Sequence, residues 1–242
     1  MKVLLLAGTG EGRRIAAELH RMGVPAVASL AGETREAMPL ALPTRVGGFG
    51  SAQGFADYLR KEKITHVLDA THPFAVNISA RSAQVAAQQG VKYLQFLRDP
   101  WVAGPNDLWT EIDTEEAVAG LLSTPSTVFL ATGRKTLAKF KNLEGHRVLV
   151  RQIDPPTSPI PFEGGEFIIG RPPFSVKQEV ALFEALGVDL LVVKNAGGQA
   201  SYSKLEAASV LGLPVAMIRR PAQPDVARVA HIEAALDWVR AR

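Results

Sequence analysis

Short apolar runs alternate with amphipathic stretches along almost the whole sequence, and this alternation restricts the possible folds more than any other feature. A run of four to six apolar residues has the length of a buried strand, whereas apolar residues three and four positions apart mark one face of a helix. Strands that alternate with helices form parallel sheets covered by helices. We therefore expect an α/β protein with strands at residues 3–6, 26–30, 44–46, 66–70, 93–97, 127–130, 147–153, 167–170, 189–193 and 215–218.

The amphipathic stretches supply the expected helices. Ser51 and Ser175 each precede such a stretch, where a hydroxyl accepts a hydrogen bond from the first helical turn as an N-cap. Asp113 or Thr114 holds the same place before a stretch in the second half. The expected helices cover residues 13–22, 55–61, 75–89, 114–122, 137–140, 176–186, 205–211 and 232–239.

One turn-rich segment divides the chain. Residues 98–107 contain Pro100, Gly104, Pro105 and Asn106, which favour turns over helices and strands. The alternation of strands and helices starts again after this segment. We expect two domains, residues 1–98 and residues 99–242, each built on an open parallel sheet.

The composition excludes several classes of protein. The chain has no cysteine, so disulfides and thiolate metal sites are absent, and no pair of its five histidines has metal-ligand spacing. A net charge of +3 gives no basic stripe of the kind that binds nucleic acid. No apolar stretch reaches the roughly 18 residues that a membrane-spanning helix needs. We expect a cytoplasmic protein that binds no metal, nucleic acid or membrane; the oligomeric state stays open, with a monomer compatible with the sequence.

A glycine-rich turn follows the first predicted strand. It consists of Gly8, Thr9, Gly10, Glu11 and Gly12, and a helix is expected directly after it. Glycines allow the backbone to approach a pyrophosphate, and a helix N-terminus supplies N–H groups and a partial positive charge. The spacing departs from G-x-G-x-x-G, because Arg13 stands where the third glycine belongs. The turn predicts a dinucleotide site, although a tight turn without a ligand has the same pattern.

The second predicted strand indicates which dinucleotide. An enzyme that uses NADH places an acidic residue at this strand end to bind the ribose hydroxyls. Here the strand ends at Ser29, and Thr34 and Arg35 follow a few residues later. These side chains can donate to the 2′-phosphate of NADPH, which an acid would repel. NADPH is the expected cofactor, unless Arg35 is only a solvated loop charge.

Two further loops of the first half follow predicted strands. In open parallel sheets, ligands bind beyond the carboxyl ends of the strands. Gly48 and Phe49 lie in the loop after the third strand, where the adenosine is expected. Thr71 and His72 lie in the loop after the fourth strand. His72 is a candidate for catalysis, and capping of the next helix is the alternative.

Loops of the second half gather cations and glycines at predicted strand ends. These loops are candidate ligand sites, because ligands bind beyond the carboxyl ends of parallel strands. A lysine that ends a buried strand, as Lys194 does, is expected to have a partner. The candidates are Thr132, Gly133, Arg134, Lys135, Arg171, Lys194, Asn195, Gly197, Gly198 and Arg219.

Several of these segments together resemble one family, the precorrin-6A reductases of cobalamin (vitamin B12) biosynthesis. The Gly-Gly-Phe-Gly block at residues 47–50 and the Thr-His-Pro-Phe-Ala block at residues 71–75 are more specific than the glycine turn. The matching stretches run in order through nearly the whole chain. They cover residues 3–12, 29–32, 46–50, 69–75, 132–134, 194–198 and 217–221.

The resemblance implies a function. It implies NADPH-dependent reduction of one carbon–carbon double bond in the precorrin-6A macrocycle, giving precorrin-6B. It also implies two Rossmann-like lobes with the tetrapyrrole in the cleft between them. Thr132, Gly133, Arg134, Arg171, Lys194, Asn195, Gly197 and Gly198 would then bind the carboxylate-rich substrate, and His72 or solvent would supply the proton.

Three alternatives stay open at this point. The chain could reduce the cobalt-containing macrocycle with NADH, as a relative in the anaerobic route does. It could be an NADPH-dependent reductase for a different anionic substrate. It could also be a sensor that binds NADPH without catalysing a reaction, because a shared fold does not fix function.

Overall fold

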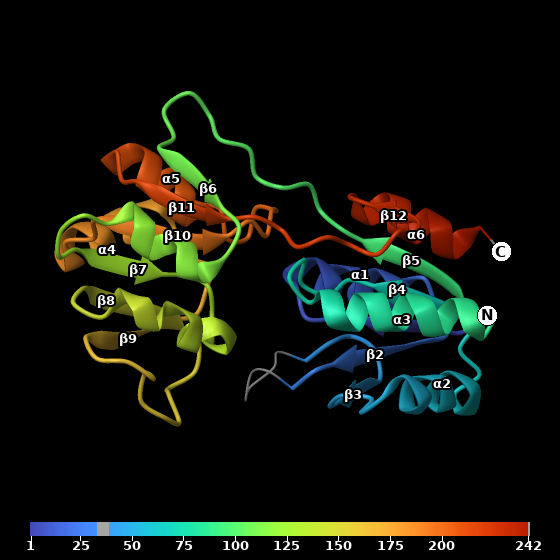
Figure 1. Cartoon of the computed structure of the whole chain (residues 1–242). Helices are drawn as coiled ribbons and strands as arrows, with labels where there is room; N and C mark the ends of the chain where they lie inside the picture. The colour runs from blue at the N-terminus through green and yellow to red at the C-terminus, as the bar shows by residue number, and fades with distance from the viewer. Residues whose placement is uncertain (33–38, 242) are drawn as a thin grey trace. The chain divides into compact units, whose positions relative to one another are not determined.

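The computed structural model describes residues 1–32 and 39–241, and these form two compact units. Unit 1 comprises Met1–Asp99 together with Pro221–Arg242, and unit 2 comprises Pro100–Arg220. Each unit is an α/β layer structure around one parallel sheet of six strands (Figure 1). The expected fold class is therefore confirmed.

The sheet of unit 1 has the strand order β12-β5-β4-β1-β2-β3, and all its pairs are parallel. Its helices cover both faces of this sheet. The elements are β1 (Val3–Leu6), α1 (Gly10–Arg21), β2 (Ala26–Leu30), β3 (Thr44–Val46), α2 (Ala52–Lys61), β4 (His66–Asp69), α3 (Val76–Gln88), β5 (Lys92–Phe96), β12 (Arg228–Val229) and α6 (Ile232–Arg240).

Successive residues of β1 point to opposite faces of the sheet, and both faces are buried. Leu5 packs in a core with Ile15 of α1 and Leu236 of α6. Leu4 packs in a second core with Phe55 of α2 and Val85 of α3. Burial on both faces explains why the strand is a continuous apolar run instead of an alternating one.

The sheet of unit 2 has the order β6-β11-β10-β7-β8-β9 and is also entirely parallel. The α-helices α4 and α5 pack together on one core, and the 3-10 helices η1 and η2 pack on each other. The elements are β6 (Trp109–Ile112), η1 (Glu115–Leu121), β7 (Thr127–Leu130), η2 (Arg134–Leu143), β8 (Arg147–Gln152), β9 (Gly165–Ile169), α4 (Val176–Leu186), β10 (Leu190–Lys194), α5 (Ser203–Leu211) and β11 (Val215–Ile218).

Two predicted N-caps are confirmed. The Ser51 hydroxyl accepts a hydrogen bond from the Gly54 amide at 3.1 Å, so α2 begins at Ala52 and not at residue 55. Ser175 forms a capping box with Gln178 at the start of α4. The stretches expected as helices at 114–122 and 137–140 are instead the 3-10 helices η1 and η2.

Two strands were not predicted. In β6 only Ile112 is buried, because this strand lies at the edge of its sheet. The other, β12, has two residues and no apolar run. Both are too short and too polar for the periodicity to mark them.

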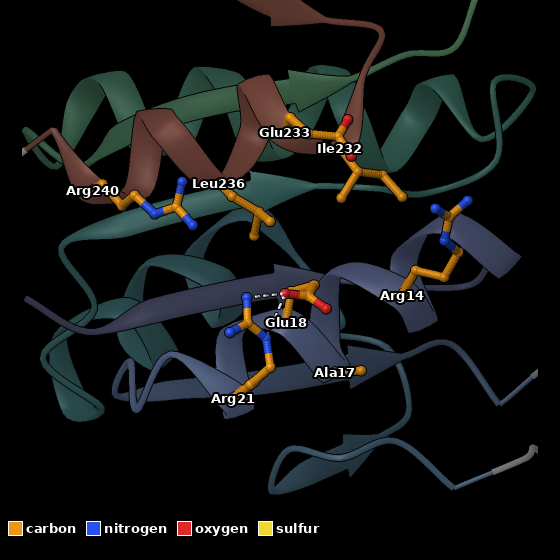
Figure 2. A pocket seen from close by; sticks show the side chains of 8 residues that line it. All are labelled: Arg14, Ala17, Glu18, Arg21, Ile232, Glu233, Leu236 and Arg240. Carbon is orange, nitrogen blue, oxygen red and sulfur yellow. Dashed lines mark hydrogen bonds and ion pairs between the residues drawn. The ribbon is translucent and has the colours of Figure 1, made fainter.

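The C-terminal segment corrects the predicted domain 99–242. Strand β12 pairs with β5, and α6 packs against α1 in unit 1. Figure 2 shows a groove between α1 and α6, with Leu236 and Ile232 on the α6 side. The amphipathic pattern of residues 232–239 predicts a helix with one buried face, but it does not specify which sheet that face covers.

Substitution of Leu236 by alanine tests this assignment. The side chain is 6% exposed within the unit 1 core, so its truncation is expected to cost about 2–5 kcal/mol of stability. Amide hydrogen exchange should show faster exchange across unit 1 and unchanged exchange in unit 2. Val210→Ala on α5, where the side chain is 70% exposed, is the control with little expected effect. Faster exchange in unit 2 alone would contradict the assignment.

Candidate functional site

The glycine turn connects β1 to α1 at the carboxyl edge of the unit 1 sheet. The helix begins at Gly10, so Gly10, Glu11 and Gly12 are helical and the turn is shorter than expected. The Thr9 hydroxyl accepts a hydrogen bond from the Gly12 amide at 3.0 Å. The same hydroxyl donates to the carbonyl of Ala70, just beyond β4, at 3.0 Å. Thr9 thus fixes the start of α1 to the end of the neighbouring strand.

Gly12 lies beside the end of β4. A Cβ on Gly12 would be in ordinary van der Waals contact with the Ala70 carbonyl oxygen, at 3.4 Å, and with the Thr9 hydroxyl, at 3.4 Å. Packing alone therefore does not require glycine at residue 12.

The acidic side chain in this turn is neutralised. Glu11 pairs with Arg98, which follows β5, and both side chains are largely buried. An unpaired carboxylate at a helix N-terminus would repel a phosphate, whereas the helix end itself attracts one. With Glu11 paired, the first-turn amides of α1 form a site suited to an anion.

The end of β2 contains a residue that sequence reasoning missed. Ser29 is paired in register with Arg45 of β3, and the Arg45 Nη1 donates to the Ser29 hydroxyl at 2.8 Å. Arg45 also donates to the carbonyls of Gly47 and Gly48, and its guanidinium lies 4.0 Å from the centroid of the Phe49 ring. Only the register of β2 with β3 brings Arg45 to this position, and the sequence does not give that register. The predicted Thr34 and Arg35 lie outside the described residues.

The loop after β4 is held by a buried carboxylate. Asp69 is 1% exposed and accepts the Tyr93 hydroxyl at 2.6 Å and the Thr71 amide at 3.0 Å. Burial, followed by the charge of Asp69 and the hydrogen bond to it, raises the pKa of Tyr93, so this hydroxyl stays protonated. The Thr71 hydroxyl lies 3.3 Å from that of Ser79. Asp69 and Tyr93 therefore position Thr71; the sequence placed Asp69 in the matching stretch 69–75 without a role, and Tyr93 was not identified.

His72 closes the turn that precedes α3. Its Nδ1 accepts the Phe74 amide at 3.2 Å, and its carbonyl accepts the Ala75 amide at 2.7 Å. The N-cap of α3 is Ala75, without a side-chain bond, so the alternative that His72 caps this helix is wrong. Because Nδ1 is an acceptor, the proton of the neutral ring is on Nε2.

The carboxyl edge of the unit 2 sheet has a lysine with the expected partner. Lys194 ends β10 and its ammonium lies 3.3 Å from a Glu115 carboxylate oxygen and 3.1 Å from the Thr136 hydroxyl. Burial lowers the pKa of Lys194, although Glu115 opposes the shift. Lys139 also binds Glu115 at 3.3 Å and lies 3.8 Å from Glu116, so two lysines and two glutamates form this cluster.

The other predicted residues of this edge differ in their contacts. Arg171 lies 3.4 Å from Asp154, and the exposed Arg219 pairs with Glu111 and Asp113. Arg134 is the first residue of η2 and follows Gly133, whose φ of +76° favours glycine. The Thr132 hydroxyl is buried and has no hydrogen-bond partner among the described residues.

Asn195 has a structural role. Its amide oxygen accepts the Trp101 backbone amide at 2.8 Å, and its amide nitrogen donates to the Trp101 carbonyl at 3.0 Å. The Trp101 indole donates to the carbonyl of Gly198 at 2.9 Å, while Gly197 and Gly198 both have positive φ. The block at residues 194–198 thus fixes Trp101, and Asn195 has both amide groups engaged.

Other candidate features are less informative. Among residues 1–32 and 39–241, no group of three or more potential ligands could hold a metal ion. No described helix is long and apolar enough to cross a membrane. The groove of about 430 Å³ in Figure 2 is lined by Arg14, Ala17, Glu18, Arg21, Ile232, Glu233, Leu236 and Arg240, none of which is a candidate site residue.

Comparison with known proteins gives consistent matches over the full length. The model of the family described as "Precorrin-6x reductase CbiJ/CobK" matches residues 2–240. The precorrin-6A reductase of Rhodobacter capsulatus is 42% identical, over 98% of this chain and 95% of the relative. That of Mycobacterium tuberculosis is 41% identical, over 98% and 97%.

More distant relatives and a solved structure extend the comparison. The cobalt-precorrin-6A reductase of Priestia megaterium is 27% identical, over 90% of each chain. The solved structure described as "CobK precorrin-6A reductase" superposes with a TM-score of 0.95 at 41% identity, covering 99% of this chain and 96% of that one. The fold and the sequence therefore match over both units.

Tyr93→Phe tests the role of the Asp69–Tyr93 contact. It removes one donor from a buried carboxylate and is expected to lower the free energy of unfolding by about 1–3 kcal/mol, measured by urea denaturation. Tyr58→Phe is the matched control, because no hydrogen bond of the Tyr58 hydroxyl is found among the described residues, and phenylalanine keeps the ring beside Phe49 and Arg45. Its expected change is within about 0.5 kcal/mol. Equal losses in the two variants would show that the Asp69 contact contributes nothing.

Proposed function

Because the chain belongs to the precorrin-6x reductase family, a family of cobalamin biosynthesis, we propose that it reduces one carbon–carbon double bond of precorrin-6A with NADPH, giving precorrin-6B. The observation that carries the proposal is the full-length identity of 38–42% to precorrin-6A reductases. Identity to the cobalt-precorrin-6A reductases is 27–28%, which favours the metal-free substrate.

The carboxyl edge of unit 1 fits a nicotinamide dinucleotide. The first-turn amides of α1 provide a cradle for the pyrophosphate. Gly8, Thr9, Gly10, Glu11 and Gly12 form this cradle, with Glu11 neutralised by Arg98. Thr71 lies in the adjacent loop, where Asp69 fixes its backbone. When bound, the nicotinamide supplies the hydride.

The end of β2 fits the extra phosphate of NADPH. No acid stands at Ser29, and the guanidinium of Arg45 is held beside it by the Ser29, Gly47 and Gly48 oxygens. Three such bonds leave donors of the guanidinium available to a 2′-phosphate. We assign this role to Ser29 and Arg45, with Gly48 and Phe49 beside the adenosine. The guanidinium over the Phe49 ring is thereby held in a fixed orientation.

Substrate binding and protonation are assigned to other residues. Arg134, Arg171 and Lys194 provide cations for the carboxylates of the macrocycle, and Thr132, Gly133, Gly197 and Gly198 shape the same sheet edge. Asn195 is a positioning residue through Trp101. We propose His72 as the proton donor; donation from Nε2 requires the imidazolium, which forms when Nδ1 releases the Phe74 amide and binds a proton. Reduction requires that this proton reach the carbon that does not receive the hydride.

Anaerobic mixing of the protein with NADPH and precorrin-6A tests the reaction. The nicotinamide absorbance is expected to fall by one equivalent per macrocycle reduced. If the protein binds NADPH but the nicotinamide absorbance does not change, the proposal is wrong. That result would favour a sensor that binds NADPH without catalysing a reaction. If the protein reduces cobalt-precorrin-6A and does not reduce precorrin-6A, the reaction is instead that of the anaerobic route.

His72→Gln tests the proton donor and is expected to lower kcat by about 100-fold or more. An unchanged kcat would show that solvent supplies the proton.

Cofactor choice is tested by dissociation constants for NADPH and NADH. We expect NADPH to bind at least about tenfold more tightly, which corresponds to about 1.4 kcal/mol. Arg45→Ala should remove this preference and leave NADH affinity unchanged, and Ser29→Asp should reverse it by repulsion of the phosphate. Arg60→Ala, on the exposed end of α2, is the control. Equal affinities in the wild type would contradict the assignment and favour the NADH-dependent reaction.

A further inference from the structure

Lys204 is a partly buried cation that none of the assignments above uses. It is the second residue of α5. Its ammonium donates to the carbonyl of Ser201 and lies 5.8 Å from the centroid of the Trp101 ring. Because α5 follows the loop after β10, Lys204 lies at the carboxyl edge of the unit 2 sheet. This is the same edge at which Lys194 and Arg134 lie.

The nearby carboxylate already has a counter-ion. Glu179, in the first turn of α4, is buried and accepts two hydrogen bonds of 2.7 Å from the guanidinium of Arg151. The Arg151 guanidinium also lies 4.8 Å from the Phe129 ring centroid and 4.6 Å from that of Phe174. Among the described residues, no carboxylate forms an ion pair with Lys204. The cluster of Arg151, Glu179 and Lys204 therefore carries one uncompensated positive charge.

Trp101 lies near this charge, and Tyr202 lies next to Trp101. The ring centroids of Trp101 and Tyr202 are 6.0 Å apart, and both side chains pack partly buried against the unit 2 core. The Asn195 side chain binds both the amide and the carbonyl of Trp101, and the Trp101 indole donates to the Gly198 carbonyl. Trp101 is thus held in place before any ligand binds, so binding costs little ordering of this side chain.

We propose that Lys204, with Trp101 near it and Tyr202 next to Trp101, binds a carboxylate side chain of the conjugated macrocycle, as a subsite separate from Lys194. The proposal rests on the proposed function for the identity of the ligand. A carboxylate supplies the counter-ion that the cluster lacks, and the flat rings offer an apolar surface to the macrocycle next to it. If Lys204 had only a structural role, replacing it would not change the affinity for a ligand carboxylate.

The charge state of Lys204 makes the proposal testable by pH. Burial lowers its pKa to about 8; the field of Arg151 from β8 adds to the shift and that of Glu179 from α4 opposes it. The ammonium is present below this pH and is lost above it. If only the ammonium binds the carboxylate, the dissociation constant should rise about tenfold from pH 7 to pH 9.

The experiment is titration of the full-length protein with precorrin-6A, without NADPH, followed by tryptophan fluorescence. At pH 7, Lys204→Met is expected to weaken binding at least about tenfold. Lys204→Arg should retain affinity and lose the dependence on pH, since arginine stays charged. The matched control is Lys141→Met, an exposed lysine of η2 in the same unit, which should bind as the wild type does.

The outcomes separate this inference from the proposed function. The subsite alone is overturned if Lys204→Met binds precorrin-6A as tightly as the wild type does. It is also overturned if wild-type binding does not weaken between pH 7 and pH 9. Failure of the wild type to bind precorrin-6A overturns the proposed function and the subsite with it. Lys204→Gln, checked for the wild-type unfolding midpoint, gives a second measurement if Lys204→Met unfolds.

Discussion

Parallel pairing of the strands is the constraint on which the rest of this structure depends. Because every strand of a sheet runs in the same direction, all carboxyl ends meet at one edge and the connections must return across a face. The returning helices bury both faces, as Leu4 and Leu5 show by packing into opposite cores. Polar side chains are therefore confined to the strand ends. The parallel direction of the strands therefore places the candidate residues of each unit at the carboxyl edge of its sheet.

Charges at these edges follow a second regularity. The acidic side chains closest to the proposed sites are already paired within their own unit: Glu11 with Arg98, Glu115 with two lysines, and Glu179 with Arg151. Each pairing neutralises an acidic side chain beside an edge where an anionic ligand is proposed to bind. The net charge of +3 does not reveal this arrangement. Local pairing, and not overall composition, makes the edges suited to anions.

Much of the fold could be predicted from the sequence, because buried strands are continuous apolar runs and the hydroxyls of Ser51 and Ser175 mark helix starts. Contacts between distant segments could not. Arg45 stands beside Ser29 only through the register of β2 with β3, and Asp69 meets Tyr93 only through the pairing of neighbouring strands. The edge strand β6 lacked an apolar pattern altogether. Periodicity reports which residues are buried, whereas the site depends on which strands are neighbours.

The order of elements along the chain has a consequence for synthesis. Unit 2 is one continuous segment, Pro100–Arg220, whereas unit 1 lacks β12 and α6 until the residues that follow unit 2 are translated. At about 5–20 residues per second, the ribosome needs on the order of ten seconds to pass unit 2. During that time the apolar residues that α6 covers, among them Ile15 and Leu19 of α1, lack their partner. The unit that emerges first is thus the one that completes its core last.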